Sequence, residues 1–316
     1  MRHLVVTADD GFYGEQRDVG IVRCLKGFGV TEVSIIVNST LAASLLPLSN
    51  ASRTERSRLF AFLHAENHIP GLHFNLTEGI PLCPARTVAT LTNEQDHFLG
   101  KYGLRKKLLS SSGENSVRQD HIERELERQL LNFHHLFLAP PSHVDGHQHI
   151  HVLPAIVPVL CRILPRHGVR WIRLPQEARA NLESASAYLT TESLDFYRTI
   201  SSQAAAAKPK FIASGLRCTD AFVGMTLMGR NQTLTKVIQS LQRVGDNGAI
   251  TVEFMTHPGF PLKQNQAGDV GCGEGPDEFS CSTDREFEME FLLSEPFKSS
   301  LEQNSYRRMR FADLLP

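Results

Sequence analysis

Short apolar runs with the character of β-strands alternate with helical patterns along the 316 residues of the chain. The strand-like runs occupy residues 3–10, 32–38, 71–76, 142–147, 169–175 and 249–257, and the helical patterns 18–27, 55–67, 121–138, 154–164 and 233–244. This alternation predicts βαβ units around a largely parallel sheet. This number of strand-like runs, at irregular spacing, favours an α/β fold of the distorted (β/α) TIM-like barrel type over a short doubly wound sheet. No clean linker interrupts the pattern, so we expect one domain over residues 1–316.

Two segments lack this periodicity. Residues 80–120 lie between two strand motifs and are predicted to be an inserted loop with a short helix, of the kind that covers a site. Within it, Phe98 and Tyr102 are expected to pack the loop rather than stack on a ligand. Residues 262–283 are Gly-rich and polar and follow a strand directly. We expect them to form a mobile loop near the mouth of the site.

The charge balance excludes some classes of partner. The chain has 33 basic and 34 acidic side chains, a formal net charge of −1, and so provides no overall field that would gather nucleic acid or an anionic membrane. The apolar stretch at the N-terminus runs only from Leu4 to Val6, which fits neither a signal peptide nor a membrane span. The six cysteines form no C-x-x-C pair, so we expect reduced thiols in a cytoplasmic, soluble protein.

Histidines are concentrated in one short segment. Four of the fourteen lie between residues 143 and 151, in the order HVDGHQHIH. If this segment stays extended, Asp145, His147, His149 and His151 share one face, whereas a bend at Gly146 would break that register. Imidazoles offered together with a carboxylate are typical ligands of zinc and similar divalent ions. The competing interpretation is a surface turn or a run of hydrogen-bonded core histidines.

Polar side chains also mark other strand ends. Asp9 and Asp10 follow an apolar run, His73 lies inside GLHFNLTEG, and Glu253 and His257 lie in VEFMTHPG. Taken singly, the aspartates would suit a helix N-cap or a turn, and His73 would be a satisfied core histidine. Taken together they indicate one pocket, because the carboxyl ends of parallel strands line a common rim.

These blocks, with PSHVDGHQHIHVLP, resemble the YdjC family of carbohydrate deacetylases, which includes the chitooligosaccharide deacetylases. The resemblance runs in the same order over about residues 3–316. The RDVGI segment at 17–21, DAFVG at 220–224 and the closing YRRMRFADLL are similar to its animal members in particular.

The resemblance implies a distorted barrel that holds one divalent cation, Mg favoured and Zn possible, and removes the acetyl group from an N-acetylated amino sugar. By likeness of position, Asp10, His73 and His147 would bind the metal. Asp9 would be the general base and His257 the general acid. Asp145, His149 and Glu253 would form an outer shell, and Arg173 could face the substrate. The implied partner is a small carbohydrate, and a homodimer is plausible for the family.

The chemistry supports this assignment independently. Amide hydrolysis needs an activated water, a polarised carbonyl and a proton for the departing amine, and a metal held by three side chains keeps positions open for the first two. Neighbouring aspartates on a regular strand point to opposite faces, so both reach one centre only if the chain bends, which Gly11 permits. The family usually has DDFG where this chain has DDGF, so the loop beside Asp10 is expected to differ.

Two other functions remain compatible with the residues alone. Another metal-dependent hydrolase, such as an amidohydrolase or phosphoesterase, would usually begin with an H-x-H pair on an early strand, where this chain has TADD. A barrel that binds metal or ligand without catalysis is the second alternative, and the DDGF loop is its support.

Overall fold

The computed structural model describes residues 1–109, 116–263, 271–273 and 276–314. Seven parallel strands form one sheet in the order β4-β3-β2-β1-β6-β5, with β7 beside β1. The strands are β1 (Arg2–Gly11), β2 (Glu32–Ile35), β3 (Gly71–Phe74), β4 (Val144–Gly146), β5 (Ala221–Val223), β6 (Thr251–Thr256) and β7 (Tyr306–Arg308). The predicted parallel α/β architecture is thereby confirmed.

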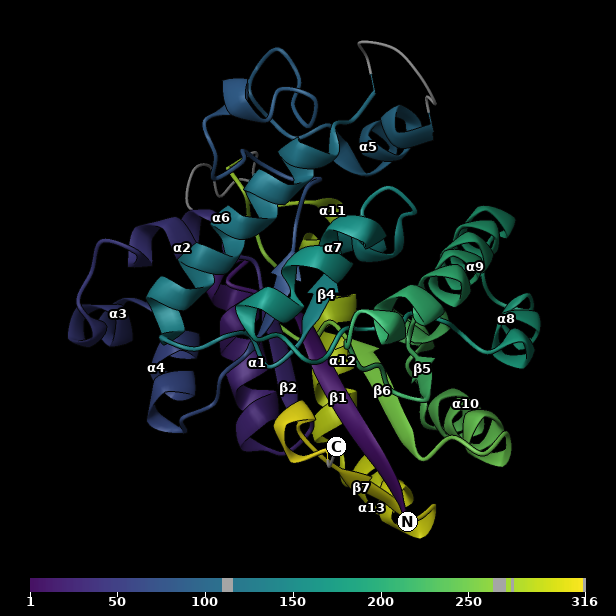
Figure 1. The fold of residues 1–316 in the computed structure, drawn as a ribbon. Coiled ribbons are helices and arrows are strands. Elements are labelled where there is room, and N and C mark those ends of the chain that lie inside the picture. The colour runs from purple at the N-terminus through teal and green to yellow at the C-terminus, as the bar shows by residue number, and fades with distance from the viewer. Residues whose placement is uncertain (110–115, 264–270, 274–275, 315–316) are drawn as a thin grey trace.

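The central strand β1 is buried on both faces, which explains the uninterrupted apolar run from Leu4 to Val6. Leu4, Val5 and Val6 are completely buried. The register pairs Val6 with Phe254 of β6 on one side and Ala8 with Val33 of β2 on the other. In Figure 1, β1 runs upward from the N-terminus, so the carboxyl ends of the parallel strands lie in the upper half of the molecule.

The sheet curls into a half-barrel, which approximates the predicted TIM-like barrel. Single parallel bridges link Ile172 to Val144 of β4 and Glu177 to Phe222 of β5, so the 171–177 segment lies between these two strands. The predicted strand at 169–175 is therefore present only as isolated bridges. Its backbone amides bond alternately to the segments on either side. The Ile172 amide donates to the Arg217 carbonyl, and the Arg173 amide donates to the Val144 carbonyl, each at 2.9 Å.

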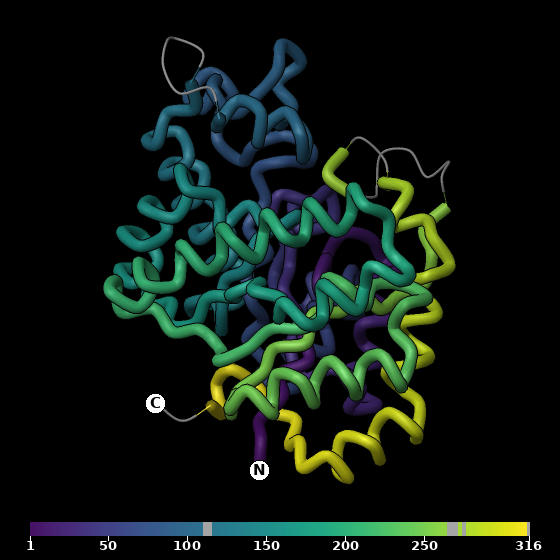
Figure 2. The backbone as a smooth tube through the Cα atoms, turned by 90° about the vertical axis from the view of Figure 1, so that its right-hand side faces the viewer, coloured from purple at the N-terminus to yellow at the C-terminus, as the bar shows by residue number. Residues whose placement is uncertain are grey.

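Helices cover the outside of the curled sheet. On one side lie α1 (Glu15–Lys26), α2 (Thr40–Leu45), α3 (Asn50–Arg56), α4 (Arg58–Ala65) and α6 (Gln119–Phe137), and on the other α8 (Arg179–Ala185), α9 (Thr191–Ala213) and α10 (Leu234–Asp246). The remaining outer helices are α7 (Val157–Ile163), α12 (Asp284–Leu293) and α13 (Glu295–Gln303). Figure 2 shows the green helices running across one side, in front of β1.

All five predicted helices have counterparts, and the structure adds others that were not predicted, among them α2, α8, α9, α12 and α13. The pattern at 55–67 is divided between α3 and α4, because Ser57 is extended there and its hydroxyl caps α4 by accepting from the Phe60 amide. The 23-residue helix α9 was not predicted, since it contains Pro209 and a run of alanines that gives little amphipathic signal.

The inserted segment contains a short 3₁₀ turn (Ala85–Thr87) and the helix α5 (Gly100–Leu109). Phe98 is buried, as expected, whereas Tyr102 is 65% exposed and does not pack the insertion. Residues 110–115 lie outside the described part of the chain. Figure 1 shows the insertion above the carboxyl ends of the strands.

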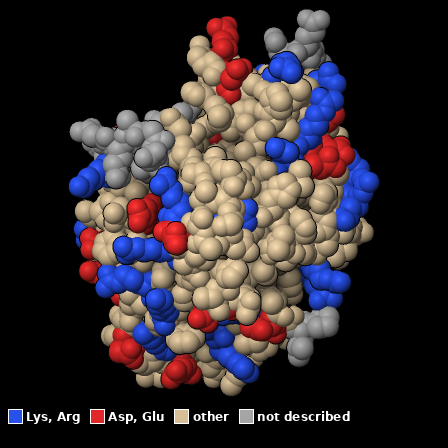
Figure 3. Space-filling view, turned by 90° about the vertical axis from the view of Figure 1, so that its left-hand side faces the viewer, with Lys and Arg blue, Asp and Glu red and all other residues tan. Residues whose placement is uncertain are grey.

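None of the helices in the described ranges is both long and apolar enough to cross a membrane. On the face drawn in Figure 3, basic and acidic side chains are interspersed rather than gathered into one patch of a single sign.

Candidate metal and active site

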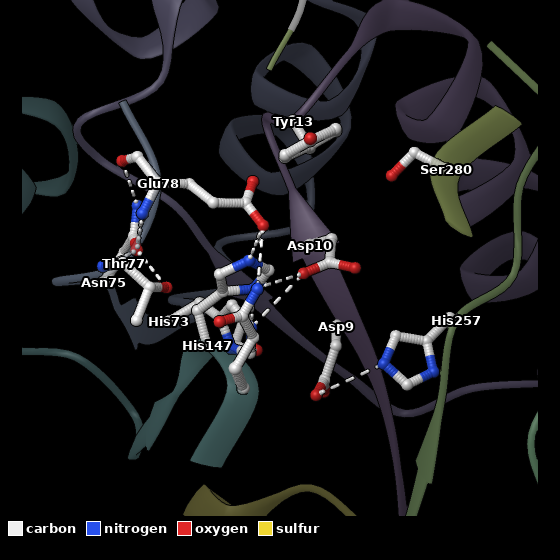
Figure 4. A network of polar contacts seen from close by, with 12 residues as sticks. Asp9, Asp10, Tyr13, His73, Asn75, Thr77, Glu78, His147, His257 and Ser280 are labelled. Carbon is white, nitrogen blue, oxygen red and sulfur yellow. Dashed lines mark hydrogen bonds and ion pairs between the residues drawn. The ribbon is translucent and has the colours of Figure 1, made fainter. Parts of the chain in front are cut away.

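Polar side chains from four strand ends line one cavity of about 260 Å³. Asp9 and Asp10 come from β1, His73 from β3, and His147 and His257 from the residues that follow β4 and β6. The structure therefore brings together all five residues predicted to bind metal or transfer protons (Figure 4). Lys101 of α5 and the aromatic rings of Phe196, Tyr197 and Phe279 complete much of the wall.

Asp10, His73 and His147 offer three ligand atoms that face one another. Oδ1 of Asp10 lies 3.3 Å from Nε2 of His73 and 3.2 Å from Nδ1 of His147, and these two nitrogens are 3.3 Å apart. Within the described residues this oxygen has no well-directed hydrogen bond, although it is buried. One carboxylate and two imidazoles converging in this way fit a divalent cation.

Two further groups of potential ligands occur among the described residues, Asp9–His73–Asp145 and His143–Asp145–Glu253. Both contain carboxylates that already bind a guanidinium. Arg173 lies 2.5 Å from Asp9, 2.9 Å from Asp145 and 2.9 Å from Glu253. A cation at either position would lie against that positive charge. Arg17 also approaches Asp10, but at 3.9 Å and on Oδ2, the oxygen that does not contact the histidines. The group formed by Asp10, His73 and His147 (the Asp10 group) is therefore the better candidate.

Asp145 orients His73. The Asp145 Oδ1 atom lies 2.7 Å from Nδ1 of His73, and Oδ2 accepts a hydrogen bond from the Ser34 hydroxyl at 2.8 Å. Burial opposes ionisation, but the charges of Arg173 and His73 hold the pKa of Asp145 well below its usual range. Burial favours a neutral His73 ring, but the carboxylates of Asp145 and Asp10 raise the pKa of His73 to about 9, so without metal the ring is protonated on both nitrogens. A cation would replace the proton on Nε2, while Asp145 would keep the proton on Nδ1.

Glu78 orients His147 in the same manner, and sequence reasoning missed it. Its Oε1 lies 2.8 Å from Nε2 of His147 and accepts from the side-chain amide of Gln148 at 2.9 Å. Although burial opposes it, the charge and hydrogen bond of His147 lower the pKa of Glu78. The only available signal was its place at the end of GLHFNLTEG, five residues after His73.

Asp9 is held by two hydrogen bonds from Arg173, at 2.5 and 2.6 Å. Burial raises the pKa of Asp9 to about 6, although the charge of Arg173 acts in the opposite direction. Arg173 is 1% exposed and does not line the cavity. Its position therefore favours holding Asp9 rather than touching a substrate.

His257 lies beside Asp9, with 3.9 Å between Nε2 and the Asp9 carboxylate. Its backbone amide donates to Glu288 at 2.6 Å, its carbonyl accepts from Arg17 at 3.2 Å, and its ring packs edge-on against Phe279. Burial, together with the charges of Arg285 and Arg17, holds the pKa of His257 well below its usual value. The free protein therefore carries a neutral imidazole at neutral pH.

The histidine run does not present one common face. β4 ends at Gly146, and Gln148 and His149 then take left-handed conformations, with φ of 55° and 58°. Of the four residues that an extended strand would align, Asp145 and His147 reach the Asp10 group and His149 lines the cavity. His151 instead lies 3.2 Å from the Arg173 carbonyl. The bend after Gly146 is the reason for this division.

The bend beside Asp10 also differs from the expectation. Asp10 and Phe12 have positive φ, 63° and 66°, whereas Gly11 does not. Gly11 is required for another reason, because a Cβ atom there would lie 2.8 Å from Cγ2 of Ile35. The Phe12 amide donates to the buried Asp18 carboxylate at 2.8 Å, which anchors the loop to α1.

Glu253 does not line the cavity, and its carboxylate accepts hydrogen bonds from Thr7 and Arg173. From the 262–283 segment, Asp277 and Phe279 line the cavity, and the segment includes the short helix α11 (Glu278–Cys281). The predicted mobility of its residues 264–270 and 274–275 lies outside the described residues.

Residues 3–303 match the model of the YdjC-like protein family. The chain belongs to this family. It is 40% identical to a carbohydrate deacetylase of Mus musculus over 98% of this chain and 94% of the relative. It is 29% identical to a chitooligosaccharide deacetylase of Serratia marcescens over 81% of each chain. The YdjC-like fold is also similar to the crystal structure of a putative cellobiose-phosphate cleavage protein from Enterococcus faecalis V583, with a TM-score of 0.68, 18% identity and coverage of 100% and 99%.

Proposed function

We propose that this protein is a metal-dependent hydrolase that removes acetyl groups from N-acetylated carbohydrates. The observation that carries the proposal is the convergence of Asp10, His73 and His147 within 3.3 Å of one another, beside Asp9 and His257 in the same cavity. The relatives named carbohydrate deacetylase, which are up to 40% identical, support the substrate class.

The cation would be held by Oδ1 of Asp10, Nε2 of His73 and Nδ1 of His147. When bound, it supplies a Lewis acid that polarises the acetyl carbonyl and lowers the pKa of water. Mg²⁺ is the favoured ion from the family resemblance, and the two imidazoles also suit Zn²⁺. Asp145 and Glu78 fix the imidazole orientations through their outer nitrogens.

Asp9 is assigned as the general base. A base is most effective when its pKa lies near the operating pH, and a pKa of about 6 places Asp9 close to that condition. The paired contacts from Arg173 keep the carboxylate in one orientation, so that it can take a proton from the attacking water.

His257 is assigned as the general acid. Because its ring is neutral in the free protein, it must first gain a proton, and Asp9 lies 3.9 Å from Nε2. The proton taken from water can pass from the Asp9 carboxylate to this imidazole, and from there to the departing amine nitrogen. His149, with the aromatic wall of the cavity, would contact the sugar.

The proposal is tested by acetate release from N-acetylglucosamine and chitin oligomers. Protein stripped with a chelator is reloaded separately with Mg²⁺, Zn²⁺, Mn²⁺ or Co²⁺. Metal-dependent release is expected to disappear in His147→Ala and Asp9→Asn. It should persist in His167→Ala, because His167 is exposed and does not line the cavity. Absence of acetate release with every metal and sugar would contradict the proposal.

Asp9→Asn also separates the alternatives. A deacetylase should lose turnover in this variant while retaining metal, whereas a binding barrel should retain its ligand affinity. Release of a product other than acetate, from a different amide or ester, would favour another metal-dependent hydrolase. We also propose that the protein acts in the cytoplasm and forms a homodimer. Size-exclusion chromatography with light scattering measures the oligomeric state directly.

A further inference from the structure

The turn formed by Gln148 and His149 follows directly after the metal-ligand candidate His147. Both residues have left-handed backbones, with φ/ψ of 55°/26° and 58°/31°. Such conformations cost about 1–3 kcal/mol each in residues other than glycine, so they persist only where surrounding contacts impose them.

Two contacts from distant segments impose this turn. From one side, the Glu78 carboxylate accepts from both the Gln148 side chain and His147. From the other side, Arg105 of α5 donates from Nη2 to the Gln148 carbonyl at 2.7 Å. Arg105 is therefore the residue through which the inserted segment reaches the backbone of the metal-ligand candidate.

The surroundings of Arg105 suit this single task. None of the carboxylates in the described part of the chain is paired with it, and its Nε has no hydrogen-bond partner there. Its guanidinium lies 5.0 Å from the ring centroid of Phe196 on α9, and Lys101 lies over the same ring at 3.9 Å. Burial lowers the pKa of Arg105 to about 10, so it remains charged at neutral pH.

We propose that Arg105 is a positioning residue that clamps the Gln148–His149 turn and thereby holds His147 in its metal-binding orientation. The inserted segment is then part of the metal site as well as a cover over the cavity. This inference rests on the proposed function, because it requires His147 to bind a cation. It adds a role for the insertion, which does not itself supply a metal ligand.

The test measures Co²⁺ affinity by visible absorption, independently of acetate release. Arg105→Met keeps an apolar stem against Phe196 but removes the donors, and it is expected to weaken Co²⁺ binding by roughly 10-fold or more, as losses of outer-sphere support do. Arg105→Lys, which retains one donor, should recover most of the affinity. Lys107→Ala, on the same helix, is the matched control and should bind like the unmodified protein.

Chemical rescue separates a clamp from a general loss of structure. Arg105→Ala leaves space for a free guanidinium ion, and millimolar guanidinium, far below denaturing concentrations, should restore Co²⁺ affinity. It should leave His147→Ala unchanged. Equal affinities in Arg105→Met and Lys107→Ala, or no restoration of Arg105→Ala, would overturn the clamp.

The two proposals fail in different ways. Tight Co²⁺ binding without acetate release on any sugar would reject the deacetylase function, and the Arg105 comparison would still decide the clamp. Absence of Co²⁺ binding by the unmodified protein would reject both. Thermal unfolding of each variant identifies any that does not fold. If Arg105→Met or Arg105→Ala does not fold, the comparison of Arg105→Lys with Lys107→Ala decides. A Co²⁺ affinity of Arg105→Lys more than 100-fold below that of Lys107→Ala would reject the proposed role of Arg105.

Discussion

His73 and His147 have equivalent support, since each presents one ring nitrogen to Asp10 and the other to a second carboxylate. The carboxylate is Asp145 for the first and Glu78 for the second. This pattern fixes both tautomer and ring orientation, which is how proteins usually prepare imidazoles for metal binding. At the scale of single residues, the candidate site is thus defined by five side chains rather than three.

Replacing Asp145 by Asn should weaken metal binding by roughly 10- to 100-fold, because the amide no longer draws the His73 proton to Nδ1. Isothermal titration with Zn²⁺ measures the change. Asp195→Asn, an exposed position on α9, is the control and should leave affinity unchanged. If Asp145→Asn bound Zn²⁺ as tightly as the unmodified protein, the orienting role would be wrong.

Gly11→Ala should destabilise the protein by about 1–3 kcal/mol, as overpacking of a closed core does. The added Cβ would lie 2.8 Å from Cγ2 of Ile35 and 3.1 Å from the Ser34 carbonyl. Urea denaturation measures the free energy of unfolding. Because Ile35→Ala removes that methyl group, the double variant should lose less than the sum of the single losses. Strict additivity would argue against the clash.

At the scale of elements, the 171–177 segment lies between β4 and β5. It is held there by the Glu177 carboxylate and by the β-bridge between Glu177 and Phe222. The Glu177 carboxylate accepts from the backbone amides of Gly224 and Met225, each at 3.1 Å, and from Asn181 at 3.0 Å. Burial nevertheless raises the pKa of Glu177 to about 7. The segment that completes the curl of the sheet therefore depends on a carboxyl group that is partly protonated at neutral pH.

The raised pKa predicts that this group contributes to stability in acid and loses that contribution as pH rises. The contribution is fully present below the ordinary value of 4.5 and is lost as pH rises through about 7. Glu177→Gln should therefore flatten the fall in unfolding free energy between these two pH values. Denaturation at several pH values tests this, with Glu183→Gln on the exposed side of α8 as the control. An unchanged slope in Glu177→Gln would assign the pH dependence to other groups.

At the scale of the whole molecule, the candidate metal site joins segments that lie far apart in the chain. Its ligands come from β1, β3 and the turn after β4, and Arg105 connects them to the insertion. A ligand that binds only the folded state stabilises all of these segments together. Metal binding and global stability are thus expected to be coupled.

Saturating metal should raise the melting temperature, by the equivalent of about 2.7 kcal/mol at a concentration 100-fold above Kd. Calorimetry with and without chelator measures the shift. His147→Ala should show no such shift, whereas His167→Ala should keep it. An equal shift in His147→Ala would indicate that the stabilising metal binds elsewhere.

The sequence by itself determined the parallel α/β class and placed Asp9, Asp10, His73 and His257 in one site, because parallel strands end at a common edge and these residues lie at strand ends. It did not determine which side chains support them. Glu78 binds His147 across 69 residues, Arg105 binds Gln148 across 43, and Arg173 binds Asp9 across 164. The sequence anticipated a bend beside Asp10 and a possible bend at Gly146, but not that Asp10 and Gln148 themselves would take left-handed conformations. Only the tertiary structure decides these features, because each depends on contacts between segments whose separation along the chain has no periodic signature.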